Sequence, residues 1–272
     1  MLERRRSAGA AVLWLYSLFT LFVLAYMVYQ SLRPKNHILS KTLAWPETWT
    51  LDNFVRIFTV GKFHEYFWNS LIILAASLAA VVILSSMTAY GIGRYQFKGK
   101  QAVLIYFLLG LMFPVQLGIV PVFLIVRGLG LIDTHLSVIL VMAAGMSMPV
   151  FLLTTFFARL PDEIYESAKV DGAGEWRTFF QIMFPLASPV VVSICIIMSV
   201  QIWNQFFVPL IFLQTEGNKT VPLMILKYTR NILHNADLAL SGSVMATVPI
   251  LILFFMFSQR VLEGVAQGGV KG

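Results

Sequence analysis

Residues 159–186 read RLPDEIYESAKVDGAGEWRTFFQIMFPL and lie between two long apolar runs. Their acidic and basic side chains are costly in hydrocarbon, so we expect this stretch to lie outside a bilayer. Pro161 and Asp162 are typical of a helix start, where proline is tolerated and an acid suits the positive end of the helix. Gly172 can adopt the left-handed conformation that ends many helices. The stretch therefore predicts a short amphipathic helix, a sharp turn and a second helix.

The second helix is predicted to carry an apolar stripe. Trp176, Phe179, Phe180 and Ile182 recur at the three-to-four spacing of one helix face. Pro185 follows closely and ends the segment before the next apolar run. We expect a helix of this kind to lie along the membrane surface.

The sequence on both sides of this stretch has the composition of a membrane protein. Of its 272 residues, 58% are apolar and 12% are charged, and the mean hydropathy is +0.79. Soluble proteins have about 45–50% apolar and about 25% charged residues, which excludes a water-soluble enzyme. Because a bilayer span needs about 20 residues, we predict an all-α, polytopic membrane protein. Its six transmembrane helices are expected at residues 8–30, 69–90, 103–126, 136–157, 187–213 and 244–261.

Six crossings place both termini on one side of the membrane. Arg4, Arg5 and Arg6 precede the first crossing, and positive side chains are favoured in cytoplasmic segments. On this assignment eleven of the 20 Lys and Arg residues are cytoplasmic and nine lie outside. We expect a multi-pass protein of the cytoplasmic (inner) membrane, with both termini and the 159–186 loop in the cytoplasm. Segment 32–67, with short or interfacial helices, and the polar loop 214–242 then face outward.

The chain lacks the residue patterns of a catalytic, cofactor or metal site. Cys195 stands alone, and His37, His64, His135 and His234 have no ligand spacing. No zinc motif, nucleophile elbow or phosphate-cradling glycine-lysine loop occurs, so we expect no catalytic residues and no ATP hydrolysis by this chain itself. The net charge of +7 is attributed to cations that flank spans and contact lipid head groups, not to nucleic-acid binding.

Several positions in the 159–186 loop stand at a fixed spacing, namely Glu166, Ser167, Ala168, Gly172, Ile182 and Pro185. In this pattern the sequence resembles the cytoplasmic loop of permeases of ATP-binding-cassette importers. That signature reads Glu-Ala-Ala, three residues, Gly, nine residues, Ile, one residue, Leu-Pro. Ser167 and Phe184 depart from it, whereas the glutamate, glycine and proline positions are intact.

Other stretches are similar to the carbohydrate branch of this family, close to the smaller permease of maltose-type importers. They are Asn69-Ser70-Leu71, Ala89-Tyr90-Gly91 with Arg94, Gly130-Leu131-Ile132-Asp133-Thr134, Trp203-Asn204-Gln205-Phe206 and Gly269-Val270-Lys271-Gly272. The resemblance implies the type I importer permease fold. Residues 1–272 would form a single transmembrane domain, with the first transmembrane helix at 8–30 and a permease core at 67–262 that contains the 159–186 loop.

The resemblance also implies that the loop is a coupling element. In such importers it rides in a groove of a cytoplasmic ATPase subunit, and Glu166 is the expected partner of a basic group there. The implied coupling residues are Glu166, Ser167, Ala168, Asp171, Gly172 and Ala173. ATP and Mg would be bound by that ATPase, so this chain needs no cofactor of its own.

The implied partners are a second homologous permease, two copies of the ATP-binding subunit, an extracytoplasmic solute-binding protein and membrane lipid. Segments 32–67 and 214–242 are the expected contacts of the solute-binding protein. The tail after Arg260 would either reach the ATPase or be a disordered cytoplasmic tail. The family pattern leaves both interpretations of the tail open.

Polar residues in two spans are candidates for a solute path. Gln201, Asn204 and Gln205 would share one face of a continuous helix, because offsets of three and four residues stack. Pro209 would leave the Gln205 carbonyl without its usual partner. Gln116 lies between two prolines of the 103–126 span. These groups suit sugar hydroxyls, but they would equally bond neighbouring helices, and the partner permease could carry the main solute site.

The chemical class of the solute stays open between several compounds. A disaccharide, an oligosaccharide, a monosaccharide and a glycerol-phosphate compound would all fit. An ion-coupled secondary transporter is the alternative from another class, and such proteins usually have intramembrane charges and internal repeats. Spans 69–90, 136–157 and 187–213 have no Asp, Glu, Lys or Arg in their interiors, which favours the importer permease.

Overall fold

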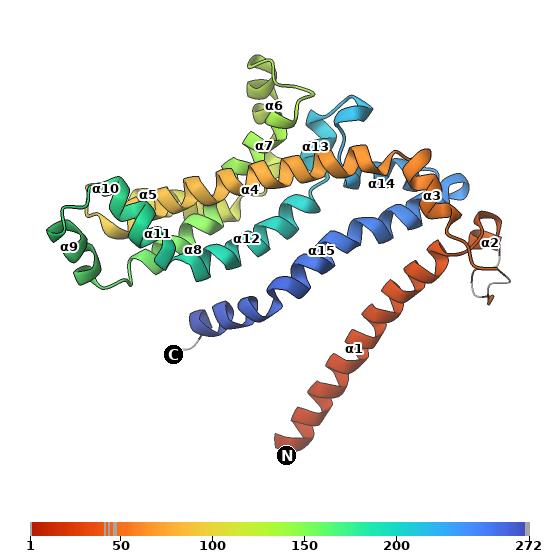
Figure 1. Ribbon diagram of the computed structural model, residues 1–272, viewed down its shortest axis with the longest axis horizontal. Helices are drawn as coiled ribbons and strands as arrows, with labels where there is room; N and C mark the ends of the chain where they lie inside the picture. Colours follow the sequence, from red (N-terminus) through yellow and green to blue (C-terminus); the bar gives the residue numbers. More distant parts are fainter. Residues whose placement is uncertain (1, 41, 43, 46–47, 270–272) are drawn as a thin grey trace. The chain divides into compact units, whose positions relative to one another are not determined.

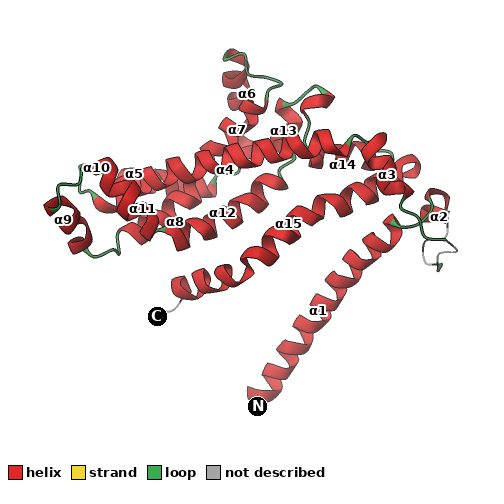
Figure 2. Ribbon diagram, viewed as in Figure 1, coloured by secondary structure: helices red, strands yellow, loops and turns green. Residues whose placement is uncertain are grey.

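The computed structural model describes the backbone of residues 2–40, 42, 44–45 and 48–269, and within these the side chains from 10 to 256. All regular elements in these ranges are helices (Figures 1 and 2). They are α1 (Leu2–Ser31), α2 (Lys35–Ser40), α3 (Asp52–Thr59), α4 (Phe63–Arg94), α5 (Lys100–Met112), η1 (Val115–Gly118), α6 (Ile119–Gly128), α7 (His135–Ala144), α8 (Ser147–Phe157), α9 (Asp162–Val170), α10 (Glu175–Thr178), η2 (Phe179–Met183), α11 (Phe184–Leu186), α12 (Ser188–Trp203), α13 (Phe207–Phe212), η3 (Glu216–Asn218), α14 (Val221–Thr229) and α15 (Ile232–Gly269). Residues 270–272 of the glycine-rich tail lie outside the described residues.

Three single helices are long and apolar enough to cross a membrane. They comprise Ala10–Ser31 of α1, all of α4, and Ile232–Met256 of α15. Three bent pairs also qualify, with bends of 98° between α5 and η1–α6, 44° between α7 and α8, and 73° between residues 175–186 and α12. If each pair crosses once, the crossings number six, as the sequence predicts. The all-α class is therefore confirmed for the described residues.

Besides the 103–126 span, which bends between α5 and η1–α6, two further predicted spans are not continuous helices. The 136–157 span breaks between α7 and α8 at Gly145, and the 187–213 span breaks between Trp203 and Phe207. In each case a proline lies in the first turn of the helix that follows, Pro149 in α8 and Pro209 in α13. The first turn tolerates proline because its N–H groups have no partner within the helix. The prolines thus set where the second half of each pair begins.

The prediction for residues 214–242 as a polar loop is wrong over most of its length. Residues 221–229 form α14, and the last helix begins at Ile232 instead of Val244. The reason is that this segment mixes charges with apolar residues that pack together. Residue contacts divide the chain into two units, Met1–Phe67 with Val221–Pro249 (unit 1) and Trp68–Thr220 with Ile250–Gly272 (unit 2), which are described separately.

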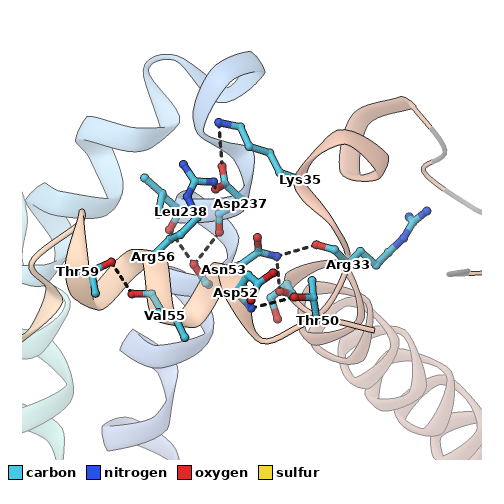
Figure 3. Close-up of polar contacts among 12 residues, drawn as sticks. Arg33, Lys35, Thr50, Asp52, Asn53, Val55, Arg56, Thr59, Asp237 and Leu238 are labelled. Atoms are coloured by element: carbon cyan, nitrogen blue, oxygen red, sulfur yellow. Dashed lines mark hydrogen bonds and ion pairs between the residues drawn. The ribbon is translucent and has the colours of Figure 1, made fainter. Parts of the chain in front are cut away.

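Unit 1 is built on a compact apolar cluster from α3, α14 and the beginnings of α4 and α15. Its members are Ile57, Phe63, Tyr66, Val221, Met224, Tyr228, Leu238 and Ala239. Next to Leu238 lies Asp237, which is fully buried. Its Oδ2 accepts a hydrogen bond from Arg56 of α3, and its Oδ1 lies 3.7 Å from Lys35 Nζ of α2 (Figure 3). This Asp237 cluster therefore connects α2 and α3 to α15.

A second polar contact in unit 1 connects α3 to the end of α1. The side-chain amide of Asn53 donates hydrogen bonds of 2.7 Å to the carbonyls of Ser31 and Arg33 (Figure 3). Asn53 is buried, and these carbonyls lie where α1 stops. The end of a helix leaves carbonyl groups without partners, so Asn53 satisfies them and fixes the connection between α1 and α3.

Unit 2 contains the 159–186 loop and the helices that support it. Ile92 of α4, Phe107 of α5 and Val150 of α8 form its buried cluster. α4 and α8 approach closely at Gly93, where a Cβ atom would lie 2.9 Å from Phe157 Cβ and 3.2 Å from the Thr154 carbonyl oxygen. Small residues are typical of closely packed membrane helices. The C-terminal end of α4 is therefore held against α8.

Two loops of unit 2 contact opposite ends of α4. Asn69, near the start of α4, donates hydrogen bonds to the carbonyls of Gly217 and Lys219 at 2.7 and 3.0 Å. Arg94, at the other end of α4, contacts Asp162 of the 159–186 loop. Residues 69 and 94 lie roughly 37 Å apart along a helix that rises 1.5 Å per residue. The two loops thus lie at opposite ends of a helix long enough to span a bilayer.

Candidate functional site

The 159–186 loop begins with the predicted helix. Pro161 precedes α9 in an extended conformation, and the first turn of α9 carries Asp162 and Glu163. Negative charge there faces the unpaired N–H groups of the helix end and is stabilised by them. The predicted start of the first helix is confirmed.

The turn after α9 is a hydrogen-bonded helix stop. The Gly172 N–H donates to the Lys169 carbonyl at 3.0 Å, and the Ala173 N–H donates to the Ala168 carbonyl at 2.9 Å. Gly172 has φ of +75°, the left-handed conformation that this stop requires. Ala168 and Ala173 are both buried. The prediction for Gly172 is confirmed, and the two alanines pack inside the turn.

The remaining predicted coupling residues lie at the surface. Glu166, Ser167 and Asp171 are exposed, as is Gly172 itself. The side chain of Val170 stands beside them with 87% of its surface exposed. The tip of the loop thus carries an exposed apolar side chain beside the carboxylates of Glu166 and Asp171.

The second helix differs from the prediction in one respect. Residues 179–183 form a π-helical turn between α10 and α11, which shifts the side chains that follow. Phe179 is buried, whereas Trp176 and Phe180 are 66% and 50% exposed and stack on each other. The expected single stripe is therefore split into a buried part and an exposed aromatic pair.

Glu175, at the start of α10, collects polar contacts that the sequence did not indicate. Its Oε1 accepts from Lys169 Nζ at 2.7 Å and from the Tyr165 hydroxyl at 2.9 Å, and its Oε2 accepts from the Tyr95 hydroxyl. Lys169 first, and Tyr95 next, lower the pKa of the Glu175 carboxyl to about 2. The same glutamate raises the pKa of Lys169. The carboxylate therefore stays charged and joins both arms of the loop.

A second polar site forms at the opposite end of unit 2. The carboxylate of Asp133 accepts from the N–H groups of Gln214 and Thr215 at 2.8 and 2.9 Å and from the Thr215 hydroxyl. The Thr215 hydroxyl is the main cause that lowers the pKa of Asp133 to about 2. Asn218 donates to the Asp133 carbonyl at 2.7 Å. These bonds attach the α6–α7 turn to the segment after α13.

The structure corrects the geometry of the predicted solute path. Gln201, Asn204 and Gln205 do not share one continuous helix face, because α12 ends at Trp203 and the chain bends before α13. The Asn204 amide donates to the Val200 carbonyl at 2.9 Å, and the Gln205 side-chain oxygen accepts from the Phe207 N–H at 3.0 Å. These two amides therefore cap helix ends at the break.

Pro209 also plays a different part from the one predicted. It lies in the first turn of α13, and Gln205 lies before that helix. The missing N–H of Pro209 therefore does not break a hydrogen bond within a helix. Gln205, Ser70 and Thr220 are among the residues that line a cavity of about 10 Å³, which has room for about one water molecule. This cavity is too small for a sugar.

Gln201 and Gln116 keep accessible side chains. Gln201 is exposed on α12, and Gln116 is exposed on η1, between Pro114 and Pro121. Among the described residues, no hydrogen bond joins Gln116 to Gln201, Asn204 or Gln205. The structure therefore leaves the two glutamines as separate candidates.

Comparison with known proteins gives a family match over most of the chain. The family described as "Binding-protein-dependent transport system inner membrane component" matches residues 82–266. The diacetylchitobiose uptake system permease protein NgcG of Streptomyces coelicolor is 34% identical over 98% of this chain and 89% of its own length. The arabinooligosaccharides transport system permease protein AraQ of Halalkalibacterium halodurans is 33% identical over 98% of this chain and all of its own.

The fold also matches that of a solved structure. A chain of a bacterial ABC transporter involved in the import of the acidic polysaccharide alginate superposes with a TM-score of 0.77 at 19% identity, covering 93% of this chain and 94% of that one. The resemblance that the loop motif indicates is thus confirmed. The chain belongs to the family of inner membrane components of binding-protein-dependent transport systems.

Proposed function

We propose that this protein is one permease subunit of an ATP-driven importer that moves a carbohydrate, either a sugar or an oligosaccharide, across the cytoplasmic membrane by alternating access. Two of its relatives are named for diacetylchitobiose and arabinooligosaccharides, and a third, SugB of Mycobacterium tuberculosis, is named for trehalose and is 30% identical over 96% of this chain. All three compounds present many hydroxyl groups. A glycerol-phosphate compound remains the alternative solute within the same transporter class.

The observation that carries the proposal is the geometry of the coupling loop. Its turn is fixed by hydrogen bonds around Gly172, while the tip with Glu166 and Val170 is exposed. A rigid, projecting tip suits a groove on a cytoplasmic ATPase, with Glu166 facing a basic side chain. ATP and Mg would bind to two copies of that ATPase, and this chain would need no cofactor or metal of its own.

The opposite ends of unit 2 support a sidedness for the complex. We place the 159–186 loop and both termini in the cytoplasm and the Asp133 site outside. A solute-binding protein would dock on the outer segments, and a solved relative was captured with a periplasmic protein carrying alginate pentasaccharide. A second homologous permease would complete the translocation path.

The proposal predicts uptake that depends on ATP. The complex with its second permease, ATPase and solute-binding protein, reconstituted in liposomes, is expected to accumulate a labelled oligosaccharide only when ATP is enclosed with the ATPase. Proton and sodium gradients without ATP serve as controls for the secondary-transporter alternative. Accumulation driven by a gradient in the absence of nucleotide would contradict the proposal.

The solute path gives a second prediction. The Gln201→Ala substitution is expected to raise the solute concentration needed for half-maximal uptake about two- to tenfold, the effect of one lost hydrogen bond. The Asn204→Ala substitution is the contrast, because that amide donates to the Val200 carbonyl at the C-terminal end of α12. Its loss should lower the melting temperature and leave the half-saturation concentration for solute unchanged. Uptake by Gln201→Ala at the wild-type half-saturation would remove this residue from the path.

A further inference from the structure

Two consecutive residues at the end of α4 attach the coupling loop. Arg94 Nη1 lies 2.5 Å from Asp162 Oδ1, and Arg94 Nη2 donates to the Asp162 backbone carbonyl at 3.3 Å. The guanidinium also stacks over the Tyr165 ring, 4.6 Å from its centre. The Arg94 side chain is only 10% exposed, although that of Asp162 is 79% exposed. The guanidinium of Arg94 therefore packs against the first arm of the loop, the part before the Gly172 turn, and is largely shielded from solvent.

Tyr95 makes the matching contact with the second arm. Its hydroxyl donates to Glu175 Oε2, while Glu175 Oε1 accepts from Tyr165 and Lys169 of the first arm. Burial and the hydrogen bond to Glu175 raise the pKa of Tyr95, so its hydroxyl remains a donor. The two arms, one on each side of the Gly172 turn, are therefore bonded to each other and to the same end of α4.

Apolar packing also holds the second arm, since the buried rings of Phe179 and Tyr90 of α4 lie 5.2 Å apart. A hollow of about 190 Å³ lies at the end of α4 beside α10. Its lining residues are Met87, Tyr90, Gly91, Tyr95, Glu175, Trp176 and Phe179. Beside that contact the hollow is left unfilled, and the polar contacts of Arg94 and Tyr95 add to the attachment there.

An ordinary exposed ion pair would contribute little. Such pairs are worth about 0–1 kcal/mol because water screens them and both side chains lose freedom. Arg94 differs because it is largely shielded, it contacts both a carboxylate and a backbone carbonyl, and its guanidinium plane rests on an aromatic ring. Arg94 and Tyr95 also act from neighbouring positions on one helix end, so the loop is held at two points and cannot pivot about one.

We infer that Arg94 and Tyr95 are positioning residues that make α4 move together with the coupling loop. This inference rests on the proposed function. The exposed tip would receive the movement of the ATPase, and the two contacts would pass it to α4, whose end is packed against α8 at Gly93. Neither residue needs to touch the ATPase or the solute for this role.

The test separates a loss of coupling between ATP hydrolysis and transport from a loss of ATPase binding. In the reconstituted complex, Arg94→Gln combined with Tyr95→Phe is expected to co-purify with the ATPase at the wild-type ratio and to keep the KM for ATP. The amount of solute carried per ATP hydrolysed should fall about fivefold or more, the usual lower range of an allosteric coupling. Lys98→Gln is the matched control, because it removes a positive charge from an exposed position in the same turn and should leave this ratio unchanged.

A covalent link supplies a rescue that a general loss of stability would not show. In a Cys195→Ser background, Arg94→Cys with Asp162→Cys should be uncoupled, and joining the two thiols with a short bismaleimide should restore solute carried per ATP. Wild-type coupling in the Arg94 and Tyr95 variants, or loss of the ATPase from them, would overturn the inference while leaving the proposed function intact. Absence of ATP-driven uptake by the wild-type complex would overturn the proposed function and this inference with it.

Discussion

The Gly172→Val substitution is expected to weaken binding of the ATPase subunit about five- to thirtyfold. An L-residue in the left-handed conformation is strained by roughly 1–2 kcal/mol, which corresponds to that change in affinity. Gly172 has φ of +75° and closes the hydrogen-bonded turn after α9. Valine is branched at Cβ and adopts this conformation poorly. The turn would refold, and the arm that carries Glu166 would change direction relative to α10. Co-purification of the ATPase with the permease, and its apparent affinity by titration, measure the effect.

Gly174→Val is the matched control. Gly174 lies two residues further on with φ of −68°, and a Cβ atom at either glycine would have no atom within 4 Å. A Cβ atom therefore meets no crowding at either position, and of the two only Gly172 has the left-handed φ. Equal loss of the ATPase from both variants would show that bulk in the loop, and not the left-handed turn, disrupts binding. Wild-type binding by Gly172→Val would remove the turn from the docking model.

The sequence predicts the loop well because its signals are local. Asp162 and Glu163 mark a helix start, and Gly172 marks its end, through interactions made within a few residues. Six crossings follow from hydropathy in the same way, since apolar length is a property of each segment alone. None of these predictions needs to know which helix packs against which.

The interruption of the 103–126 span follows from its prolines, but the breaks in the 136–157 and 187–213 spans were missed, although the sequence contains a signal for them. Pro121, Pro149 and Pro209 each occupy the third position of a helix, where the missing N–H costs nothing. If a new helix is placed to start about two residues before each of these prolines, α7 is separated from α8 and α12 from α13. Pro249 limits this rule, because it lies inside α15. A hydropathy profile does not detect such breaks, because the residues around them are apolar.

The contacts of Tyr95, Glu175 and Asp237 could not be predicted from spacing. Tyr95 and Glu175 are 80 residues apart, and Arg56 and Asp237 are 181 apart. A charged residue near the end of a span is assigned to a solvated loop unless its ion-pair partner is known. Asp237 was accordingly assigned to a polar loop, whereas the fold buries it against α3.

The Asp237 cluster gives the second large effect, and its direction follows from an asymmetry in burial. Asp237 is fully buried, whereas the side chains of Arg56 and Lys35 are 37% and 46% exposed. Removing the cation leaves a buried carboxylate without its main partner. Removing the carboxylate leaves two cations that water can still reach. The first change should therefore cost more than the second.

We expect Arg56→Ala to destabilise the folded protein by about 3 kcal/mol, near the lower end of the cost of breaking a buried pair. Lys35 limits the loss, but at 3.7 Å from Oδ1 it replaces the Arg56 contact only in part. Among the described residues, Oδ1 accepts no hydrogen bond. Asp237→Asn should cost less, and adding it to Arg56→Ala should recover part of the stability, because the buried group is then neutral. Thermal unfolding of the protein in detergent or nanodiscs measures all three variants.

Glu65→Gln provides the control from the same unit. It breaks the ion pair with Lys62, whose side chain is 62% exposed against 40% for Glu65, and exposed pairs contribute about 0–1 kcal/mol. If Arg56→Ala cost no more than Glu65→Gln, water would have to reach Asp237, and the connection from α2 and α3 to α15 would not depend on its charge. If instead the double variant were less stable than Arg56→Ala alone, the carboxylate would be stabilised by Lys35 without Arg56. The order of the three melting temperatures thus decides whether Arg56 is the group that keeps a charged aspartate buried in this membrane protein.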